Sequence, residues 1–180
     1  MNKRIAAVAL LGSLLVSATN VPAVAGSDGI ETVGNILTYA LPTVTVGAVA
    51  GHEDAEGAWQ LGKSYGLTVG TTLVLKVSID ETRPNGGHYS FPSGHTSSSF
   101  SCAEFLRERY GWRYGLPAYL AATFVGYSRV ESNNHYTHDV VAGAAIGIAS
   151  SYLFTTPYQS WHIALSADHA ALGVSFSRSW

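Results

Sequence analysis

Cysteine is nearly absent from this sequence of 180 residues, which contains only Cys102. A lone cysteine excludes an internal disulfide, so the fold must be stabilised by packing. No neighbouring basic side chain marks Cys102 as a reactive thiol, and we assign it no role. Charged residues are also scarce, at 12% of the chain against 47% hydrophobic residues. This balance predicts one globular domain with a sizeable core and excludes a disordered chain.

Basic residues are few, with 10 Lys and Arg against 12 Asp and Glu, which excludes a nucleic-acid-binding surface. Two of these basic residues precede an apolar run at residues 5–16, and small residues at 23–25 fit a cleavage site. The run is too short to cross a membrane, which needs about 20 apolar residues. We therefore expect a cleaved signal peptide over residues 1–25, followed by the domain at 26–180. Export to the periplasm, or to the periplasmic face of a bacterial envelope, follows from the signal.

Long uninterrupted apolar runs are lacking, and none reaches the ~18 residues typical of a membrane-spanning helix. We therefore favour helices buried in a soluble domain over helices that span a membrane, and membrane contact stays open. Five shorter apolar segments have lengths that fit helices: 35–50, 57–79, 97–111, 116–127 and 139–154. The chain is thus predicted to be all-α, a single bundle of about five to six helices.

Two of these segments and the tail have informative patterns. In segment 97–111, Glu104 and its polar neighbours alternate at helical spacing with apolar residues, and Gly111 is a natural stop. Segment 139–154 is apolar on all sides, so we expect it at the centre of the bundle, with Gly143 and Gly147 allowing close helix approach. Alternating apolar residues in the tail predict a short β-hairpin at the C-terminus.

The first polar cluster contains two cations, Lys76 and Arg83, seven residues apart and followed directly by Pro84. Two helical turns would place both on one face, although the proline disfavours helical dihedrals at Arg83 and predicts a loop there. In either geometry the two charges can be aimed at one anion. Taken alone, the pair would be two solvated surface cations.

The second cluster is FPSGH, residues 91–95, directly before the segment at 97–111. Gly94 permits an unusual backbone angle, and backbone amides at a helix N-terminus can converge on an oxyanion. Ser93 adds a hydroxyl donor, and His95 adds a group that exchanges a proton near neutral pH. The cluster therefore indicates an anion cradle, although an ordinary helix-capping turn would have the same residues.

The third cluster is SRVESNNHYTHD, residues 128–139. His135 and Asp139 are an i, i+4 pair that can touch, whereas the adjacent His138 and Asp139 should point in different directions. A hydrogen bond from Asp139 would fix the imidazole tautomer and leave the other nitrogen of His135 available as a nucleophile. Arg129 contributes a planar donor fork suited to phosphate oxygens.

The three clusters together resemble the signature of the type 2 phosphatidic acid phosphatase (PAP2) superfamily. The matching motifs are K-x6-RP from Lys76, PSGH at 92–95 and SR-x5-H-x3-D at 128–139. This superfamily includes lipid phosphate phosphatases, bacterial class A acid phosphatases and vanadium-dependent haloperoxidases. The resemblance implies the family's all-helical bundle. The short connection at residues 85–91 looks closer to the compact lipid-phosphatase-like members.

The resemblance also implies a mechanism. His135 would attack phosphorus, and Asp139 would orient it. His95 would protonate the leaving group and then activate water against the phosphohistidine. The phosphate oxygens would be held by three cations, a hydroxyl and an amide, at Lys76, Arg83, Arg129, Ser93 and Gly94. Because the three cations neutralise the phosphate, no metal or other cofactor is expected.

Three alternatives compete with the phosphatase. A zinc site at His135, His138 and Asp139 would leave the cations unexplained. A haloperoxidase would bind vanadate on His135, but the haloperoxidases of this superfamily are much larger. A noncatalytic envelope protein that binds phosphate or lipid head groups would not need two positioned imidazoles. The expected substrate is a phosphorylated lipid or a small phosphomonoester. The leaving group and the oligomeric state are not fixed by the sequence.

Overall fold

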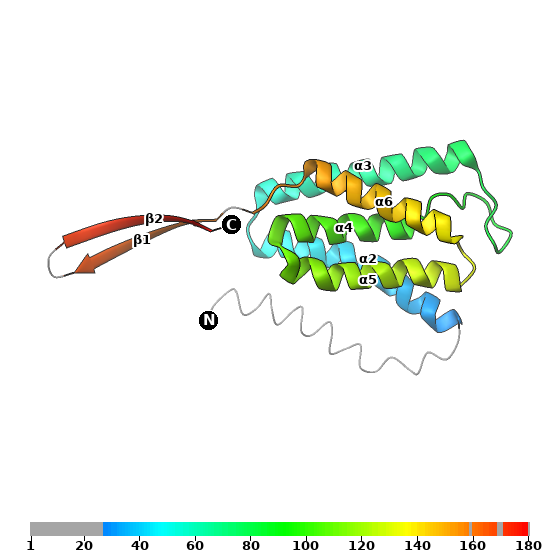
Figure 1. Cartoon of the computed structure of the whole chain (residues 1–180), viewed down its shortest axis with the longest axis horizontal. Coiled ribbons are helices and arrows are strands. Elements are labelled where there is room, and N and C mark those ends of the chain that lie inside the picture. The colour runs from blue at the N-terminus through cyan, green and yellow to red at the C-terminus, as the bar shows by residue number, and fades with distance from the viewer. Residues whose placement is uncertain (1–26, 159, 169–170, 180) are drawn as a thin grey trace.

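The computed structural model describes residues 27–158, 160–168 and 171–179. The predicted signal peptide lies outside the described residues. Within these described residues, five helices form one bundle, and two strands follow at the C-terminal end (Figure 1). The elements are α2 (Ser27–Gly51), α3 (Ala55–Ile79), α4 (Gly94–Tyr110), α5 (Trp112–Glu131), α6 (Thr137–Phe154), β1 (Ser160–Asp168) and β2 (Ala171–Ser179). The predicted all-α bundle is confirmed. Four of the five apolar segments fall within one helix, and the segment at 97–111 ends on Gly111, the residue that caps α4.

The tail forms the predicted hairpin. β1 and β2 pair antiparallel, in a register that runs from Ser160 opposite Ser179 to Asp168 opposite Ala171. The alternation of apolar and small residues in the tail is the period of an extended strand, which explains why this stretch leaves the helical pattern.

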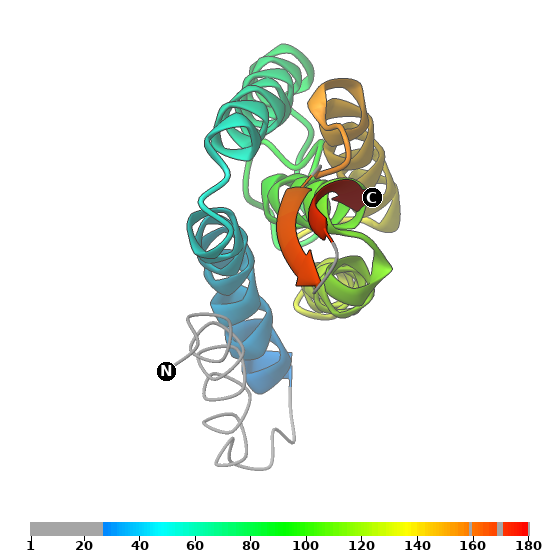
Figure 2. The same cartoon turned by 90° about the vertical axis from the view of Figure 1, so that its left-hand side faces the viewer.

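Helix α4 lies at the centre of the bundle and packs against all four other helices (Figure 2). The prediction that the segment at 139–154 would be central is wrong. α6 packs mainly against α4 and α3, and it leaves Val141, Tyr152 and Leu153 exposed. The core side chains of α4 include serines, which hydropathy does not identify as core residues. Helix packing here depends on the small size of the core side chains as well as on their apolarity.

Hydroxyl groups join α4 to its neighbours inside the bundle. Thr72 of α3 meets Ser97 at 2.9 Å, and Thr68 donates to Ser101 at 3.1 Å. Ser101 also lies 3.0 Å from the hydroxyl of Ser151 on α6. Because these polar groups bond to one another, burying them does not leave unsatisfied donors.

The expected close approach at the α6 glycines is present. A Cβ atom at Gly147 would lie 2.3 Å from the backbone oxygen of Ser97, and one at Gly143 would lie 2.6 Å from that of Ser93. The contact partners are backbone atoms of α4 and of its N-cap, which cannot move aside easily. The two glycines therefore set the distance between α6 and α4, and with it the position of the N-terminus of α6.

The polar face expected on the segment at 97–111 is not exposed throughout. Glu104 is buried, and its carboxylate accepts two hydrogen bonds from Arg107, at 2.8 and 2.6 Å, and another from Tyr119. These charge-assisted bonds compensate for the loss of water around the carboxylate. The expected stop is present, since Gly111 ends the helix with a φ of 84°.

Helix α2 is long and apolar enough to cross a membrane by length and composition. A core helix of a water-soluble protein meets the same criterion, so the finding does not distinguish the two arrangements. Large apolar side chains are also exposed on the other outer helices. They include Trp59, Leu73, Val74 and Val77 on α3, Trp112, Leu116 and Leu120 on α5, and Val141, Tyr152 and Leu153 on α6.

Candidate functional site

The three polar clusters meet at one end of the bundle. The C-terminal ends of α3 and α5 lie there, together with the N-terminal ends of α2, α4 and α6 and the connection at residues 80–93. Two backbone contacts fix this arrangement: Ser93 N donates to Asp139 O at 3.0 Å, and Ser90 N donates to Glu81 O at 2.8 Å. Residues that are far apart in the sequence therefore surround one site.

His135 and Asp139 are in contact, as their spacing predicts. His135 Nδ1 lies 3.2 Å from Asp139 Oδ2, and both side chains are almost fully buried. His135 precedes α6 and Asp139 lies in its first turn, so the pair forms across the start of the helix rather than within it. The contact occupies Nδ1 and leaves Nε2 as the nitrogen available for chemistry.

Ser90 is a site residue that sequence reasoning missed. It is fully buried and donates its hydroxyl hydrogen to Asp139 Oδ2. The backbone N–H of Tyr136 donates to the same oxygen at 3.0 Å. No spacing rule links Ser90 to Asp139, since they are 49 positions apart. Its place directly before FPSGH was the one available signal.

The pKa values of both site histidines are lowered. Burial is the main cause for His135, whose pKa falls to about 4, although the hydrogen bond with Asp139 opposes the shift. Burial also lowers the pKa of His95, and the charges of Arg129, Arg83 and Lys76 lower it further. The charges of all three cations therefore contribute to the lowered pKa of His95. Both imidazoles favour the neutral form when no anion is bound.

Arg129 is buried and joins α5 to α2. Its guanidinium donates to Asn35 Oδ1 at 2.9 Å and to the backbone oxygen of Glu31 at 3.1 Å. It also donates to the hydroxyl of Ser128 at 3.2 Å from Nε. These contacts hold the guanidinium in one orientation before any ligand binds. Burial lowers the pKa of Arg129, but an arginine remains charged at neutral pH.

Lys76 and Arg83 hold the connection at residues 80–93. Lys76 Nζ donates to the backbone oxygens of Tyr89 and Ser90 at 2.7 and 3.2 Å, and Arg83 Nε donates to that of His88 at 3.1 Å. Burial and then the charge of Arg83 lower the pKa of Lys76 to about 8. The expected loop at Arg83 is present, because α3 ends at Ile79.

Ser93 and Gly94 begin α4. Ser93 is the N-cap, and its hydroxyl accepts hydrogen bonds from the backbone and side chain of Thr96 at 3.4 and 2.9 Å. Gly94 does not adopt the unusual backbone angle that glycine permits, since it is the first helical residue and does not have a positive φ. A Cβ at Gly94 would meet Lys76 Cε at 3.8 Å, so the helix start lies beside the lysine.

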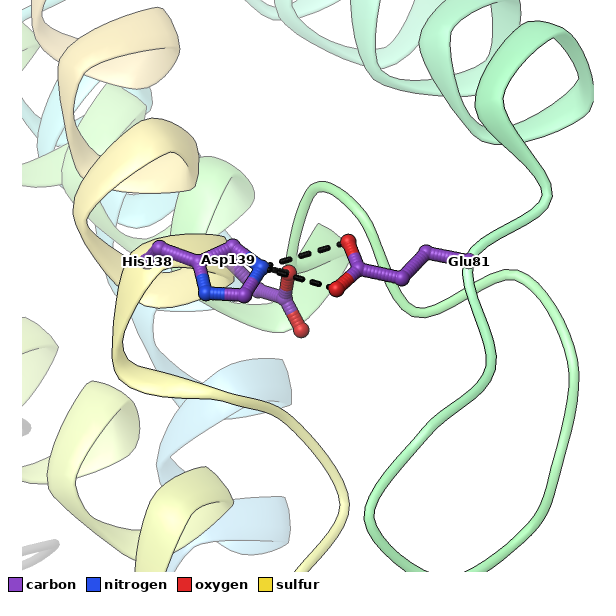
Figure 3. Close-up of side chains that lie close together, drawn as sticks. All are labelled: Glu81, His138 and Asp139. Carbon is purple, nitrogen blue, oxygen red and sulfur yellow. Dashed lines mark hydrogen bonds and ion pairs between the residues drawn. The ribbon is translucent and has the colours of Figure 1, made fainter.

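His138 does not point away from Asp139, contrary to the expectation for adjacent residues. Its Nε2 atom lies 3.1 Å from Asp139 Oδ1 and 3.0 and 3.2 Å from the two carboxylate oxygens of Glu81 (Figure 3). His135, in contrast, meets Oδ2. The zinc alternative with His135, His138 and Asp139 as ligands is therefore wrong, because the group with metal-ligating geometry among the described residues contains Glu81 in place of His135.

Comparison with known proteins identifies the family. The model of the PAP2 superfamily matches residues 85–162. The lipid A 4'-phosphatase of Helicobacter pylori is 30% identical over 175 residues, which cover 86% of this chain and 87% of that protein. The lipid A 1-phosphatase of Porphyromonas gingivalis is 43% identical over 104 residues, or 54% of this chain. That match spans only 23% of the longer protein.

A solved structure has the same fold. The crystal structure of LpxE from Aquifex aeolicus superposes with a TM-score of 0.60 at 23% identity. The match covers 68% of this chain and 83% of that one. The match to the Helicobacter pylori protein over most of both chains, the family model and the shared helical bundle agree: this chain belongs to the PAP2 superfamily.

Proposed function

We propose that this chain is a phosphatase that removes phosphate from lipid-linked phosphate monoesters or pyrophosphates through a phosphohistidine at His135. The observation that carries the proposal is the contact of Asp139 Oδ2 with His135 Nδ1. The contact leaves Nε2 of the neutral imidazole available for attack. This nitrogen lies at the end of the bundle where the charges of three cations lower the pKa of His95. The family's phosphatase relatives support the same reaction class.

In the first step, His135 Nε2 bonds to phosphorus and the bond between phosphorus and the leaving oxygen breaks. The low pKa of His135 keeps the imidazole neutral, and therefore nucleophilic, at neutral pH. As the imidazole becomes cationic, the Asp139 carboxylate stabilises it. Ser90 and Tyr136 hold that carboxylate in place through their hydrogen bonds.

His95 supplies the proton that the leaving oxygen takes up. Its pKa is lowered in the site, which disfavours the protonated form needed for this role. A phosphate dianion bound among Lys76, Arg83 and Arg129 offsets their charges and raises the pKa of His95 again. Substrate binding thus favours the protonated form of His95 that the first step requires. In the second step, neutral His95 takes a proton from water, which attacks phosphorus as the bond to His135 breaks.

The phosphate oxygens are assigned to five donors. Arg129 is already oriented by Asn35 and Glu31, and Lys76 lies beside the start of α4. The hydroxyl of Ser93 and the backbone amide of Gly94 complete the set at the helix N-terminus, which favours anions. These donors stabilise the charge of a five-coordinate transition state, so the reaction requires no metal ion.

A lipid-linked substrate is supported by the relatives, which are lipid A phosphatases, and by the surface. Large apolar side chains are exposed on α3, α5 and α6, as expected for contact with a bilayer or its interface. An apolar groove of about 470 Å³ also opens between the C-terminal half of α2 and the N-terminal half of α3, at Val46, Leu61 and Tyr65, away from the site. We therefore place the protein at the membrane of the cell envelope, on its periplasmic side.

The test is a phosphate-release panel with purified full-length protein. The panel compares lipid A, phosphatidate, an isoprenyl pyrophosphate and a small aryl phosphate, with His135→Ala as the blank. We expect release from at least one lipid-linked substrate in the presence of EDTA, and inhibition by vanadate, which adopts the five-coordinate geometry. Activity abolished by EDTA and restored by magnesium would contradict the metal-independent mechanism. Release from the aryl phosphate alone would contradict the lipid assignment.

A further inference from the structure

Glu81, His138 and Asp139 form a second cluster that the proposed reaction does not use in full. The ligating atoms of the three side chains all lie within 4.8 Å of one another. Glu81 reaches the cluster from the connection after α3, whereas His138 and Asp139 lie in the first turn of α6 (Figure 3). The cluster therefore joins two segments that are far apart in the sequence.

The buried carboxylate of Asp139 supplies an independent observation. Its side chain is fully buried, and its Oδ1 atom has no hydrogen-bond partner among the described residues. The other oxygen, Oδ2, accepts from Ser90 and Tyr136 and meets His135. A buried carboxylate oxygen without a donor is costly unless a cation compensates it. Oδ1 lies 3.1 Å from His138 Nε2, which is an ion pair only when that imidazole is protonated, and thus points into the cluster.

We propose that Glu81, His138 and Asp139 form a zinc-binding site, and that zinc bound there inhibits the enzyme. One imidazole nitrogen and two carboxylates are ligands that Zn²⁺ favours. Tetrahedral zinc with bonds of about 2.0–2.2 Å separates its ligand atoms by roughly 3.3 Å. His138 Nε2 lies 3.0 Å from Glu81 Oε1 and 3.1 Å from Asp139 Oδ1, close to that spacing.

The charges and exposure of the cluster also fit a divalent ion. Two carboxylates neutralise the ion, which offsets repulsion from the cations of the phosphate site. His138 has a side-chain exposure of 57%, so an ion can enter from solvent, and water can complete the coordination. The ligand set is thus open on one side and anchored by a buried carboxylate on the other.

Inhibition follows from the double role of Asp139, and this part rests on the proposed function. During attack, the negative charge on Oδ2 stabilises the cationic form of His135. Zinc bound to Oδ1 would draw part of that charge away from Oδ2. It would also fix the connection at residues 80–93 to α6 through Glu81. The expected result is a lower kcat, because the effect falls on the chemical step.

Binding is tested by calorimetric titration of the EDTA-treated, dialysed full-length protein with zinc chloride. We expect one zinc per wild-type chain, and an affinity at least about 10-fold lower in His138→Gln and Glu81→Gln. His88→Gln is the matched control, because His88 is exposed and its Nδ1 lies 3.5 Å from Asp80 Oδ1, with no third ligand among the described residues. Equal affinity in wild type and His138→Gln, or no binding by wild type, would overturn the site.

Inhibition is tested separately with the aryl phosphate. We expect zinc to inhibit wild type and His88→Gln at concentrations that fill the calorimetric site, with EDTA restoring activity, and to leave His138→Gln uninhibited. Equal inhibition of His138→Gln would overturn the regulatory role. The titration uses no substrate, so a failure of the proposed phosphatase reaction would be seen apart from a failure of the zinc site.

Discussion

Ser90 donates its hydroxyl hydrogen to the same Asp139 oxygen that meets His135 Nδ1. The serine thus acts through the carboxylate on His135, the proposed nucleophile, and Lys76 also donates to the backbone oxygen of Ser90. We infer that Ser90 is a positioning residue, because it holds Asp139 where it can orient His135. It does not need to touch the substrate for this role.

Replacing Ser90 with alanine tests this role. A hydrogen bond to a charged group contributes about 1.5–3 kcal/mol, so Ser90→Ala should lower kcat by roughly 10- to 100-fold. KM should change little, since the phosphate donors are intact. Ser99→Ala is the control, because the buried Ser99 hydroxyl has no hydrogen-bond partner among the described residues. A wild-type kcat in Ser90→Ala would show that Asp139 does not need the serine.

The close approach of α6 to α4 predicts a difference between two glycines. A Cβ at Gly147 would lie 2.3 Å from the backbone oxygen of Ser97, so Gly147→Ala should force the helices apart. Overpacking of this kind costs about 1–3 kcal/mol of unfolding free energy. Gly70→Ala is the matched control on α3, where a Cβ would meet nothing within 4 Å. It should be neutral or stabilising by up to about 1 kcal/mol.

Chemical unfolding followed by circular dichroism compares the two variants. We expect a lower midpoint for Gly147→Ala and an unchanged or higher midpoint for Gly70→Ala. If both variants unfolded at the wild-type midpoint, α6 would not be held against α4 as closely as the structure indicates.

The histidine pKa values predict an acidic optimum for kcat/KM. His135 must be neutral, and burial lowers its pKa to about 4. On the acid side, activity should therefore be lost as pH falls through that value. His95 must be protonated, and its pKa lies below the ordinary 6.5, so activity should fall as pH rises past this lowered value. The optimum of the free enzyme should therefore lie between these limits, on the acid side of pH 6.5.

The profile is measured with an aryl phosphate and corrected for the substrate's own second ionisation near about pH 6. Because kcat reports the substrate complex, where the bound dianion raises the pKa of His95, its alkaline limb should lie at higher pH than that of kcat/KM. A kcat/KM optimum above pH 6.5 after correction would contradict the assignment of the two histidines.

The helices could be predicted from the sequence because their apolar segments and stops are local signals. The motif residues could be found for a similar reason, since His135 and Asp139 are four positions apart and Ser93 directly precedes a helix. The central position of α4 could not be predicted. The buried hydroxyls of Ser97 and Ser101 bond to Thr68, Thr72 and Ser151, and hydropathy does not register such pairs.

The contacts of Glu81 and Ser90 were also beyond sequence reasoning. Both lie in the connection at residues 80–93, whose path depends on contacts such as that of Lys76 with two backbone oxygens. The direction of His138 was predicted wrongly because neighbouring side chains diverge inside a helix. Here Glu81 bonds to the imidazole tip, which lies beside Asp139.

The most direct test of the central claim is trapping of phosphate on histidine. Wild type, His135→Ala and His138→Ala are mixed with phosphate-labelled substrate, quenched in base and analysed by peptide mapping. We expect label on His135 in wild type and in His138→Ala, and no labelled histidine in His135→Ala. Label that survives in His135→Ala and disappears in His138→Ala would show that the nucleophile is the other histidine.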